Sequence, residues 1–266
     1  MEVVVLLAGV VDPKCRIERL ALRPDTALVD ETGLPRKLSP FDEAALETAL
    51  QLRDADPAVR VTVALIGDAS ADALLRAIAA HRPDRAFRFG GPALSLWDPI
   101  SAVRHLRDAI DVAAKHVDLV LMGREFGDSD DGVLPPSLAE ASSQSFCGLA
   151  HTLRIKEGRV IAQRMRGTHE ETLALDTPAL VSVTNHRGNR LRHPLMKNIA
   201  LARRAPLEIA SAQDLPSTGA LELQAIALAA PSARGMGRGR ILTGASEEHI
   251  RNLATVLREG LRSTAA

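Results

Sequence analysis

An aspartate-rich loop carries the residues whose chemistry is easiest to read in this chain. It spans residues 123–132, follows an apolar stretch, and contains Asp128, Asp130 and Asp131. Three carboxylates at this spacing could bind a divalent cation, and a glycine-bounded loop before a helix could hold a phosphate on backbone amides. A solvated loop with helix-capping residues is the third interpretation. The loop is neither a Walker loop nor an EF-hand loop, because the Gly-Lys-Ser/Thr and the terminal glutamate are missing.

Basic residues concentrate in residues 177–207, a segment with no aspartate or glutamate. Its cations are Arg187, Arg190, Arg192, Lys197, Arg203 and Arg204. Apolar residues lie among them, namely Pro194, Leu195, Met196 and Ile199. Such a basic segment on a chain of zero net charge would attract an acidic partner, and an apolar centre within a basic rim is typical of a docking surface. The alternative is a loop whose apolar residues pack on their own domain.

A clear helix start lies at residues 38–50. Ser39 can cap the first turn, and Pro40 suits the first helical position. Asp42 places negative charge at the positive end of the helix dipole. The small and apolar residues behind it share one face, which predicts close packing of this helix against a sheet.

The composition narrows the classes of function. Among 266 residues, 33 basic side chains balance 33 acidic ones, so no overall field favours nucleic acid or an anionic membrane. Aromatic residues make up only 2% of the chain, which argues against a base-stacking platform. The two cysteines suggest neither a disulfide framework nor a zinc site, and we expect a reduced, cytoplasmic setting. Residues 1–11 are interpreted as a buried strand rather than a signal peptide, and no apolar run approaches the ~20 residues that span a bilayer.

The first half of the chain predicts a doubly wound, mostly parallel α/β sheet of the Rossmann-like, adenine-nucleotide-binding type. Short apolar runs typical of buried strands occur at 3–7, 61–66, 86–89 and 117–122. Helical stretches are expected at 41–53, 71–81, 100–115 and about 136–146. In such a sheet the ligand crevice lies at the carboxyl ends of the strands.

The second half predicts an antiparallel meander, one more central strand and a C-terminal arm. Turn residues separate strand-like runs within residues 151–176, and residues 179–184 read as a central strand. Prolines and glycines make residues 205–240 a long irregular connection, followed by an amphipathic helix at 246–261. We expect residues 1–204 to form the α/β domain, including the meander. Residues 205–266 would form an arm whose terminal helix packs on a partner subunit.

Taken in order, these segments resemble the beta subunit of electron-transfer flavoprotein. The family's helix start, Asn-Pro-Phe-Asp-Glu, is matched by Pro40, Phe41, Asp42 and Glu43, with Ser39 in place of the asparagine. The later family motifs are matched by Arg164, Glu171, Leu173, Pro178, Leu180, Val181, Asn189, Arg192, Asn198, Ile199, Arg203, Arg204, Pro206, Leu207 and Glu208.

The resemblance implies an electron carrier, one subunit of a heterodimer whose alpha subunit holds most of the FAD at the interface. The dimer would accept electrons from flavin-dependent dehydrogenases and pass them through a quinone oxidoreductase toward the respiratory chain. Because flavin chemistry belongs to the cofactor, we expect neither catalytic residues nor a metal site in this chain. His169, His186 and His193 are then structural or surface residues.

The resemblance also implies two sets of site residues. The cofactor-binding set, part of the family's buried AMP site, is Ser39, Pro40, Phe41, Asp42, Gly123, Asp128 and Asp130. The docking set, directed at the dehydrogenase, is Arg192, Met196, Asn198 and Ile199, with Met196 in place of an anchoring leucine. However, Gly132-Val133-Leu134-Pro135 replaces the family's Asn-Gln-Thr-Gly. Because this removes polar side chains and one amide hydrogen, we expect a divergent member whose AMP site is weakened or empty.

Two rival hypotheses are kept open. A stand-alone adenine-nucleotide sensor would explain the first half of the chain but not the basic segment or the arm. A metal-dependent hydrolase would use Asp128, Asp130 and Asp131, but no base or nucleophile accompanies them.

Overall fold

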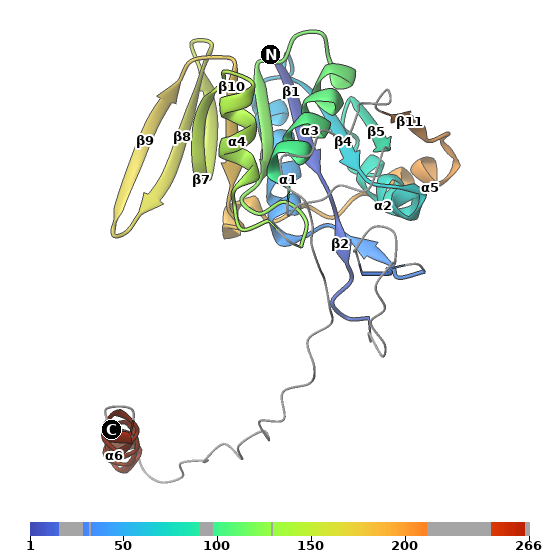
Figure 1. The fold of residues 1–266 in the computed structure, drawn as a ribbon. Helices are drawn as coiled ribbons and strands as arrows, with labels where there is room; N and C mark the ends of the chain where they lie inside the picture. The colour runs from blue at the N-terminus through green and yellow to red at the C-terminus, as the bar shows by residue number, and fades with distance from the viewer. Residues whose placement is uncertain (16–28, 32, 91–97, 129, 212–245, 264–266) are drawn as a thin grey trace. The chain divides into compact units, whose positions relative to one another are not determined.

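A large, mostly parallel sheet organises the computed structural model of the chain (Figure 1). Among the described residues its nine strands lie in the order β11 (Glu208–Ser211), β5 (Arg85–Gly90), β4 (Arg60–Ile66), β1 (Glu2–Leu7), β6 (Leu119–Gly123), β10 (Ala179–Val183), β7 (Ser145–Lys156), β8 (Arg159–Arg166) and β9 (His169–Leu175). Neighbours from β11 to β7 are parallel, whereas β7, β8 and β9 form an antiparallel meander. A second, two-stranded antiparallel sheet joins β2 (Val10–Val11) and β3 (Arg36–Lys37).

The structure describes residues 1–15, 29–31, 33–90, 98–128, 130–211 and 246–263. The chain divides into two compact units, Met1–Ile226 and Ala227–Ala266. The first contains the sheet, and the described part of the second is the helix α6 (Ser246–Ser263). Within the described residues no helix is long and apolar enough to cross a bilayer. The division at residue 204 and the packing of the arm on a partner remain predictions.

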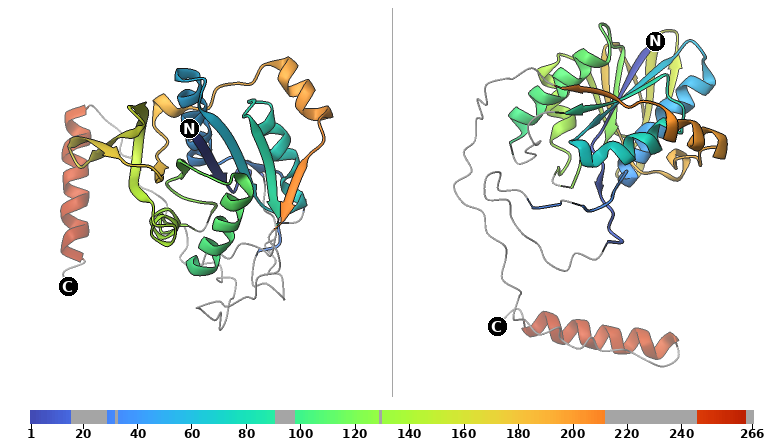
Figure 2. Two further views of the ribbon diagram at one scale, coloured as in Figure 1. Left: turned by 90° about the horizontal axis from the view of Figure 1, so that it is seen from above. Right: turned by 90° about the vertical axis from the view of Figure 1, so that its right-hand side faces the viewer.

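Helices lie on both faces of the sheet, as the views from above and from the side show (Figure 2). Side chains of α1 (Pro40–Ala55) and α2 (Asp72–Ala79) share one apolar core. Side chains of α3 (Pro99–Ala113) and α4 (Leu134–Ala141) share the other. The helix α5 (Met196–Arg204) packs against α2. The part of the chain that the structure describes also contains the short 3-10 helices η1 (Ala69–Ala71) and η2 (Arg187–Asn189).

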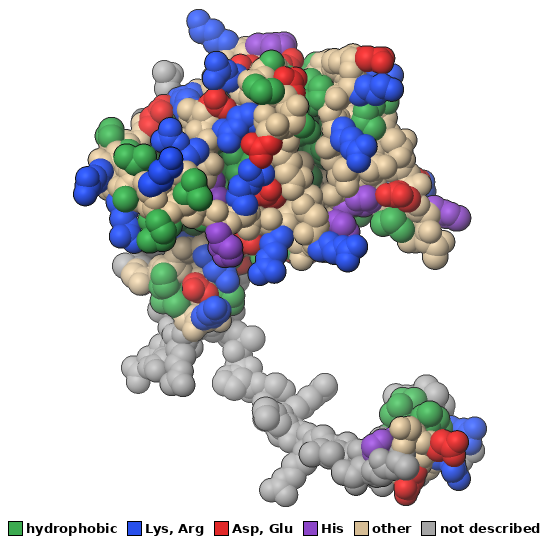
Figure 3. Space-filling view, turned by 180° about the vertical axis from the view of Figure 1, so that it is seen from behind, with side chains coloured by type: hydrophobic (Ala, Val, Ile, Leu, Met, Phe, Trp, Pro, Cys, Tyr) green, Lys and Arg blue, Asp and Glu red, His purple; other side chains and the backbone are tan. Residues whose placement is uncertain are grey.

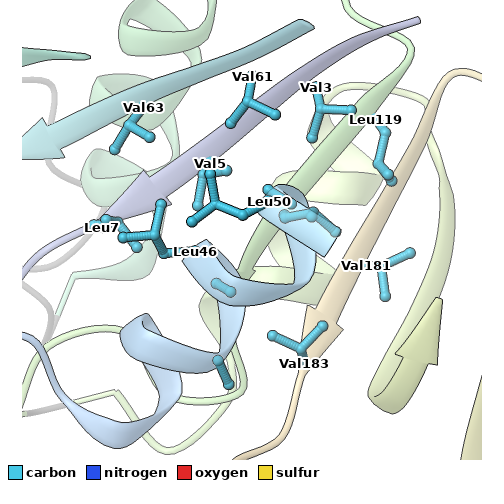
Figure 4. Close-up of a cluster of buried hydrophobic side chains, with 14 of the residues drawn as sticks. Val3, Val5, Leu7, Leu46, Leu50, Val61, Val63, Leu119, Val181 and Val183 are labelled. Atoms are coloured by element: carbon cyan, nitrogen blue, oxygen red, sulfur yellow. The ribbon is translucent and has the colours of Figure 1, made fainter. Parts of the chain in front are cut away.

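After Glu2 the central strand β1 is apolar, because its residues alternate between the two cores. Val3, Val5 and Leu7 belong to the core beneath α1, where Leu46 and Leu50 project toward the sheet (Figure 4). The intervening residues of β1 belong to the core beneath α3 and α4. The predicted doubly wound, mostly parallel α/β sheet with an antiparallel meander is therefore confirmed.

The predicted helix at 136–146 is wrong at its C-terminal end. α4 ends at Ala141, the chain turns at Ser143 with a φ of 51°, and β7 begins at Ser145. Phe146 and Cys147 pair with residues of β10, far along the chain. This pairing gives the meander a longer first strand than the sequence predicted, because the partner of a strand cannot be read from local periodicity.

A strand also occurs where the sequence predicted an irregular connection. β11 pairs in parallel with β5 at one edge of the sheet. Arg85 Nε donates to Glu208 Oε1 at 2.9 Å, which secures the start of β11. The sequence of β11, Glu-Ile-Ala-Ser, is neither an apolar run nor a strict alternation, so no local pattern reveals this strand.

Candidate functional site

The carboxyl ends of β1 and β6 meet the amino end of α1 and form the candidate site. Gly123, the last residue of β6, lies so close to α1 that a Cβ there would be 2.7 Å from the Cβ of Phe41 and 3.0 Å from its carbonyl carbon. The next residue, Arg124, donates its backbone N–H to Val183 O at 2.8 Å and so joins the loop to β10. Two predicted site residues, Phe41 and Gly123, are thus in contact because glycine permits the approach.

Ser39 and Asp42 form a reciprocal capping box at the start of α1. Asp42 N donates to Ser39 Oγ at 3.0 Å, and Asp42 Oδ2 accepts from the backbone N–H of Ser39 at 3.4 Å and of Gly9 at 3.1 Å. Asp42 is fully buried, and this burial, opposed by the hydrogen bonds from Gly9 and Ser39, raises the pKa of its carboxyl to about 6. Asp42 therefore joins the end of β1 to α1 from inside the protein, and its side chain offers no surface to a ligand.

Asp130 has a comparable internal role at the amino end of α4. Its Oδ2 accepts from Phe126 N at 3.0 Å, while its Oδ1 accepts from the N–H groups of Gly132 at 3.0 Å, Val133 at 2.8 Å and Leu134 at 3.2 Å. The side chain is buried. A carboxylate in this position satisfies the free amides of a helix start, as a phosphate would.

The Asp130 carboxylate accepts the backbone N–H groups at the start of α4 that could otherwise bind a phosphate. Residues 132, 133 and 134 all donate to Asp130. The next two residues are prolines, which have no N–H, and Ser137 N donates to Val133 O within the helix. The residues from 132 to 137 thus have an N–H with an internal acceptor or no N–H at all, which leaves no free amide hydrogen for a phosphate at this helix start.

Three residues of the predicted cofactor-binding set remain accessible. Pro40 and Asp128 are exposed, and Phe41 is half-buried. The Arg124 guanidinium carbon lies 5.3 Å from the centre of the Phe41 ring, within the range of a cation–π contact. Partial burial raises the pKa of the Asp128 carboxyl, an effect that Arg36 opposes. The predicted set therefore splits into an accessible group and an internal group made of Ser39, Asp42, Gly123 and Asp130, and its role toward a cofactor stays a prediction.

The predicted docking set also divides. Arg192 is engaged within the protein: its Nε donates to Glu47 Oε2 at 3.0 Å, its Nη2 to Glu47 Oε1 at 2.8 Å, and its Nη1 contacts Asp54. Hydrogen bonds from Arg192 to Glu47 raise the pKa of the guanidinium further. Met196, in contrast, is 79% exposed, and Asn198 and Ile199 are half-buried. Docking by these four residues stays a prediction. Within the set, the Met196 side chain is exposed, whereas Arg192 attaches the segment to α1.

Two other residues of the family motifs, Arg164 and Glu171, contact each other within the meander. Arg164 and Glu171 lie opposite each other on β8 and β9, with Nε and Oε2 2.8 Å apart. This hydrogen bond lowers the pKa of the Glu171 carboxyl. His169, His186 and His193 are all exposed.

The loop aspartates do not gather into a metal site. Within the described residues, no group of three or more His, Cys, Asp and Glu side chains is placed to hold a metal ion. Asp130 already accepts four backbone N–H groups. The metal-dependent hydrolase interpretation therefore has no support in this part of the chain.

The sequence patterns did not identify two residues that contact the segment carrying the docking set. Glu47 is buried on α1 beneath Arg192, and Arg76 on α2 contacts the end of α5. A glutamate within an apolar helix face was the available signal for Glu47, because a buried carboxylate requires a partner. No sequence signal distinguishes Arg76 from an ordinary surface arginine.

Comparison with known proteins gives a consistent result over most of the chain. A family model described as the electron transfer flavoprotein domain matches residues 26–215. The mitochondrial electron transfer flavoprotein subunit beta of Oryza sativa subsp. indica is 26% identical over 262 residues, which cover 97% of this chain and all of that protein. The electron transfer flavoprotein subunit beta of Bradyrhizobium diazoefficiens is 25% identical over 237 residues, 89% of this chain and 92% of its own. The caffeyl-CoA reductase-Etf complex subunit CarD of Acetobacterium woodii is 27% identical over 192 residues, 72% of each chain.

Proposed function

Because the chain belongs to the electron transfer flavoprotein family, in which its relatives include beta subunits, we propose that it is the beta subunit of a heterodimer. The alpha subunit would hold most of the FAD at the interface between the subunits. The heterodimer would accept electrons from flavin-dependent dehydrogenases and pass them to a quinone oxidoreductase of the respiratory chain. Flavin chemistry would come from the cofactor, and this chain would supply surfaces that orient the cofactor and the electron donor.

The observation that carries the proposal is the exposed apolar centre of the basic segment. Leu195 and Met196 are 62% and 79% exposed, and no acidic residue lies between residues 177 and 207. An unbranched thioether such as Met196 adapts readily to a partner surface. We propose that Met196 contacts the dehydrogenase, with Asn198 and Ile199 supporting it from partly buried positions.

Co-expression with an alpha subunit from the same organism tests the main proposal. A yellow one-to-one heterodimer with FAD, reduced by a flavin-dependent dehydrogenase, is the expected result. A chain that remains colourless and does not bind any alpha subunit would contradict it. The cellular compartment, which we propose to be the cytoplasm, is tested separately by fractionation, and the rice relative is a mitochondrial protein.

We further propose that the AMP site of this member is empty because Asp130 takes the place of the phosphate. The purified heterodimer should release FAD but no AMP on denaturation. Asp130→Ala should lower the free energy of unfolding by about 2–4 kcal/mol, since it removes a helix cap and leaves buried amides without an acceptor. Millimolar phosphate or AMP should then stabilise the variant but not the wild type. Stoichiometric AMP in the wild-type protein would refute this proposal.

The alternative of a stand-alone adenine-nucleotide sensor has less support. A sensor would need free phosphate-binding groups, whereas the amides of residues 132–134 donate to Asp130. A stable homodimer that carries an adenine nucleotide and refuses an alpha subunit would favour the sensor.

A further inference from the structure

The exposed docking residues lie on a segment that is fixed at both ends by side chains of the sheet-covering helices. We propose that Glu47 of α1 and Arg76 of α2 are positioning residues, which hold residues 192–205 in one conformation so that Leu195 and Met196 form a preformed docking surface. The inference rests on the proposed function, because it assigns these two residues a part in recognition of the electron donor.

Glu47 fixes the amino-terminal end of the segment. Its side chain is only 6% exposed, although it carries a charge. Both of its oxygens accept hydrogen bonds from the Arg192 guanidinium, and Oε2 also accepts from the Arg192 backbone N–H at 3.1 Å. Because the backbone itself is bound, Glu47 fixes the path of the chain as well as the side chain of Arg192.

Two further residues of α1 extend this attachment along the same helix face. Gln51, one turn after Glu47, donates from Nε2 to Gly188 O at 2.8 Å and to Glu47 Oε1 at 3.2 Å. Asp54, about one turn further, contacts Arg192. Residues at this spacing share one face of a helix, so α1 holds the chain from Gly188 to Arg192 at several points.

Arg76 fixes the carboxyl-terminal end. Its Nη1 lies within hydrogen-bonding distance of three carbonyl oxygens, at 3.1 Å from Ala202, 3.1 Å from Arg203 and 2.8 Å from Ala205. These carbonyls belong to the end of α5, where helical C=O groups lack internal partners and a cation is favourable. Ala202 is buried in the same region. Arg76 therefore caps α5 from the neighbouring helix.

Between these two attachments three apolar side chains are exposed. Leu195, Met196 and Leu201 are 62%, 79% and 55% exposed. The space-filling view shows green hydrophobic side chains among blue basic ones on the side of the molecule that carries α2 and α5 (Figure 3). The segment is thus attached at both ends, with exposed apolar side chains between the attachments.

Holding residues 192–205 in one conformation should strengthen binding to a transient partner. When a segment must become ordered on binding, each side chain that is immobilised loses conformational entropy, and this loss weakens the binding. If the ordering of one or two such side chains were required after a clamp is lost, the KM for the heterodimer as substrate of the dehydrogenase would rise about tenfold. The rate of the electron transfer step would not change, since neither Glu47 nor Arg76 is proposed to contact the flavin.

The test uses the FAD-loaded heterodimer with a flavin-dependent dehydrogenase that reduces the wild type. Glu47→Gln and Arg76→Met should each raise KM about tenfold with kcat within about twofold, and Arg76→Lys should recover part of the loss by retaining the charge. Glu157→Gln, an exposed glutamate in the turn between β7 and β8, is the matched control. Amide hydrogen exchange of α5 should accelerate in the first two variants and not in the control.

The possible failures are distinguishable. If no dehydrogenase reduces the wild-type heterodimer, the proposed function fails. If the wild type is reduced while Glu47→Gln and Arg76→Met retain its KM, the inference is wrong, whatever their exchange rates. If Glu47→Gln does not fold, Gln51→Ala provides the readout at that end of the segment, because Gln51 is exposed and its loss removes the hydrogen bonds to Gly188 O and Glu47 Oε1 but leaves the pairing of Glu47 with Arg192.

Discussion

Replacing Asp42 with asparagine should change how the stability of the protein depends on pH. Burial raises the pKa of this carboxyl from 3.8 to about 6 in the folded state. The folded protein therefore keeps a proton that the unfolded chain releases between these two pH values, and the stability of the wild type falls as the pH rises through this window. One pKa unit corresponds to about 1.4 kcal/mol, so the whole window corresponds to about 3 kcal/mol.

Asparagine does not titrate, and it keeps an oxygen that can accept from Gly9 and Ser39. The free energy of unfolding of Asp42→Asn relative to the wild type should therefore increase by about 2 kcal/mol between pH 4.5 and pH 7. Urea unfolding of the full chain at several pH values gives this difference, and it cancels the titration of groups common to both proteins. Glu157→Gln controls for the removal of one carboxylate from an exposed position. A difference that stays constant to within about 0.5 kcal/mol would refute the raised pKa of Asp42.

Three other changes give sharp outcomes. Gly123→Ala should destabilise the protein by about 1–3 kcal/mol in urea unfolding, because the new methyl group would overlap the first turn of α1; an unchanged midpoint would mean that the contact with Phe41 is looser than 2.7 Å. Met196→Ala should leave the stability within about 0.5 kcal/mol of the wild type, since the side chain is 79% exposed, yet raise the KM for the heterodimer; equal KM values would remove Met196 from the docking surface. Raising the ionic strength from 0.05 to 0.3 M should raise the same KM several-fold through screening of the basic segment, and a flat salt profile would indicate an uncharged partner surface.

Much of the fold could be predicted because its signals are local. The apolar run of β1 and the Ser39-Pro40 start of α1 each specify their element within a few residues. β7 and β11 were missed or misplaced, since each depends on pairing with a strand that is distant in sequence. Local patterns carry no information about such partners.

The candidate site was predictable in its location but not in its detail. The family resemblance grouped Phe41, Gly123 and Asp130 in one site, and the strand pattern placed the loop 123–132 at the carboxyl end of a strand, where such sheets bind ligands. The sequence could not show that Asp130 turns inward to the amides of its own loop, which depends on the backbone path after Gly127. In the same way, Arg192 was recognisable as basic, but its pairing with Glu47 joins elements that only the tertiary fold brings together.

One edge strand of the sheet bears on self-association of the protein. Among the described residues, the strand β9 lies at the end of the sheet opposite to β11. An open strand edge can pair with the same edge of another molecule and begin aggregation. β9 starts with His169, Glu170 and Glu171, so charged side chains stand at the beginning of this edge strand. The charged start of β9 should therefore discourage edge-to-edge polymerisation.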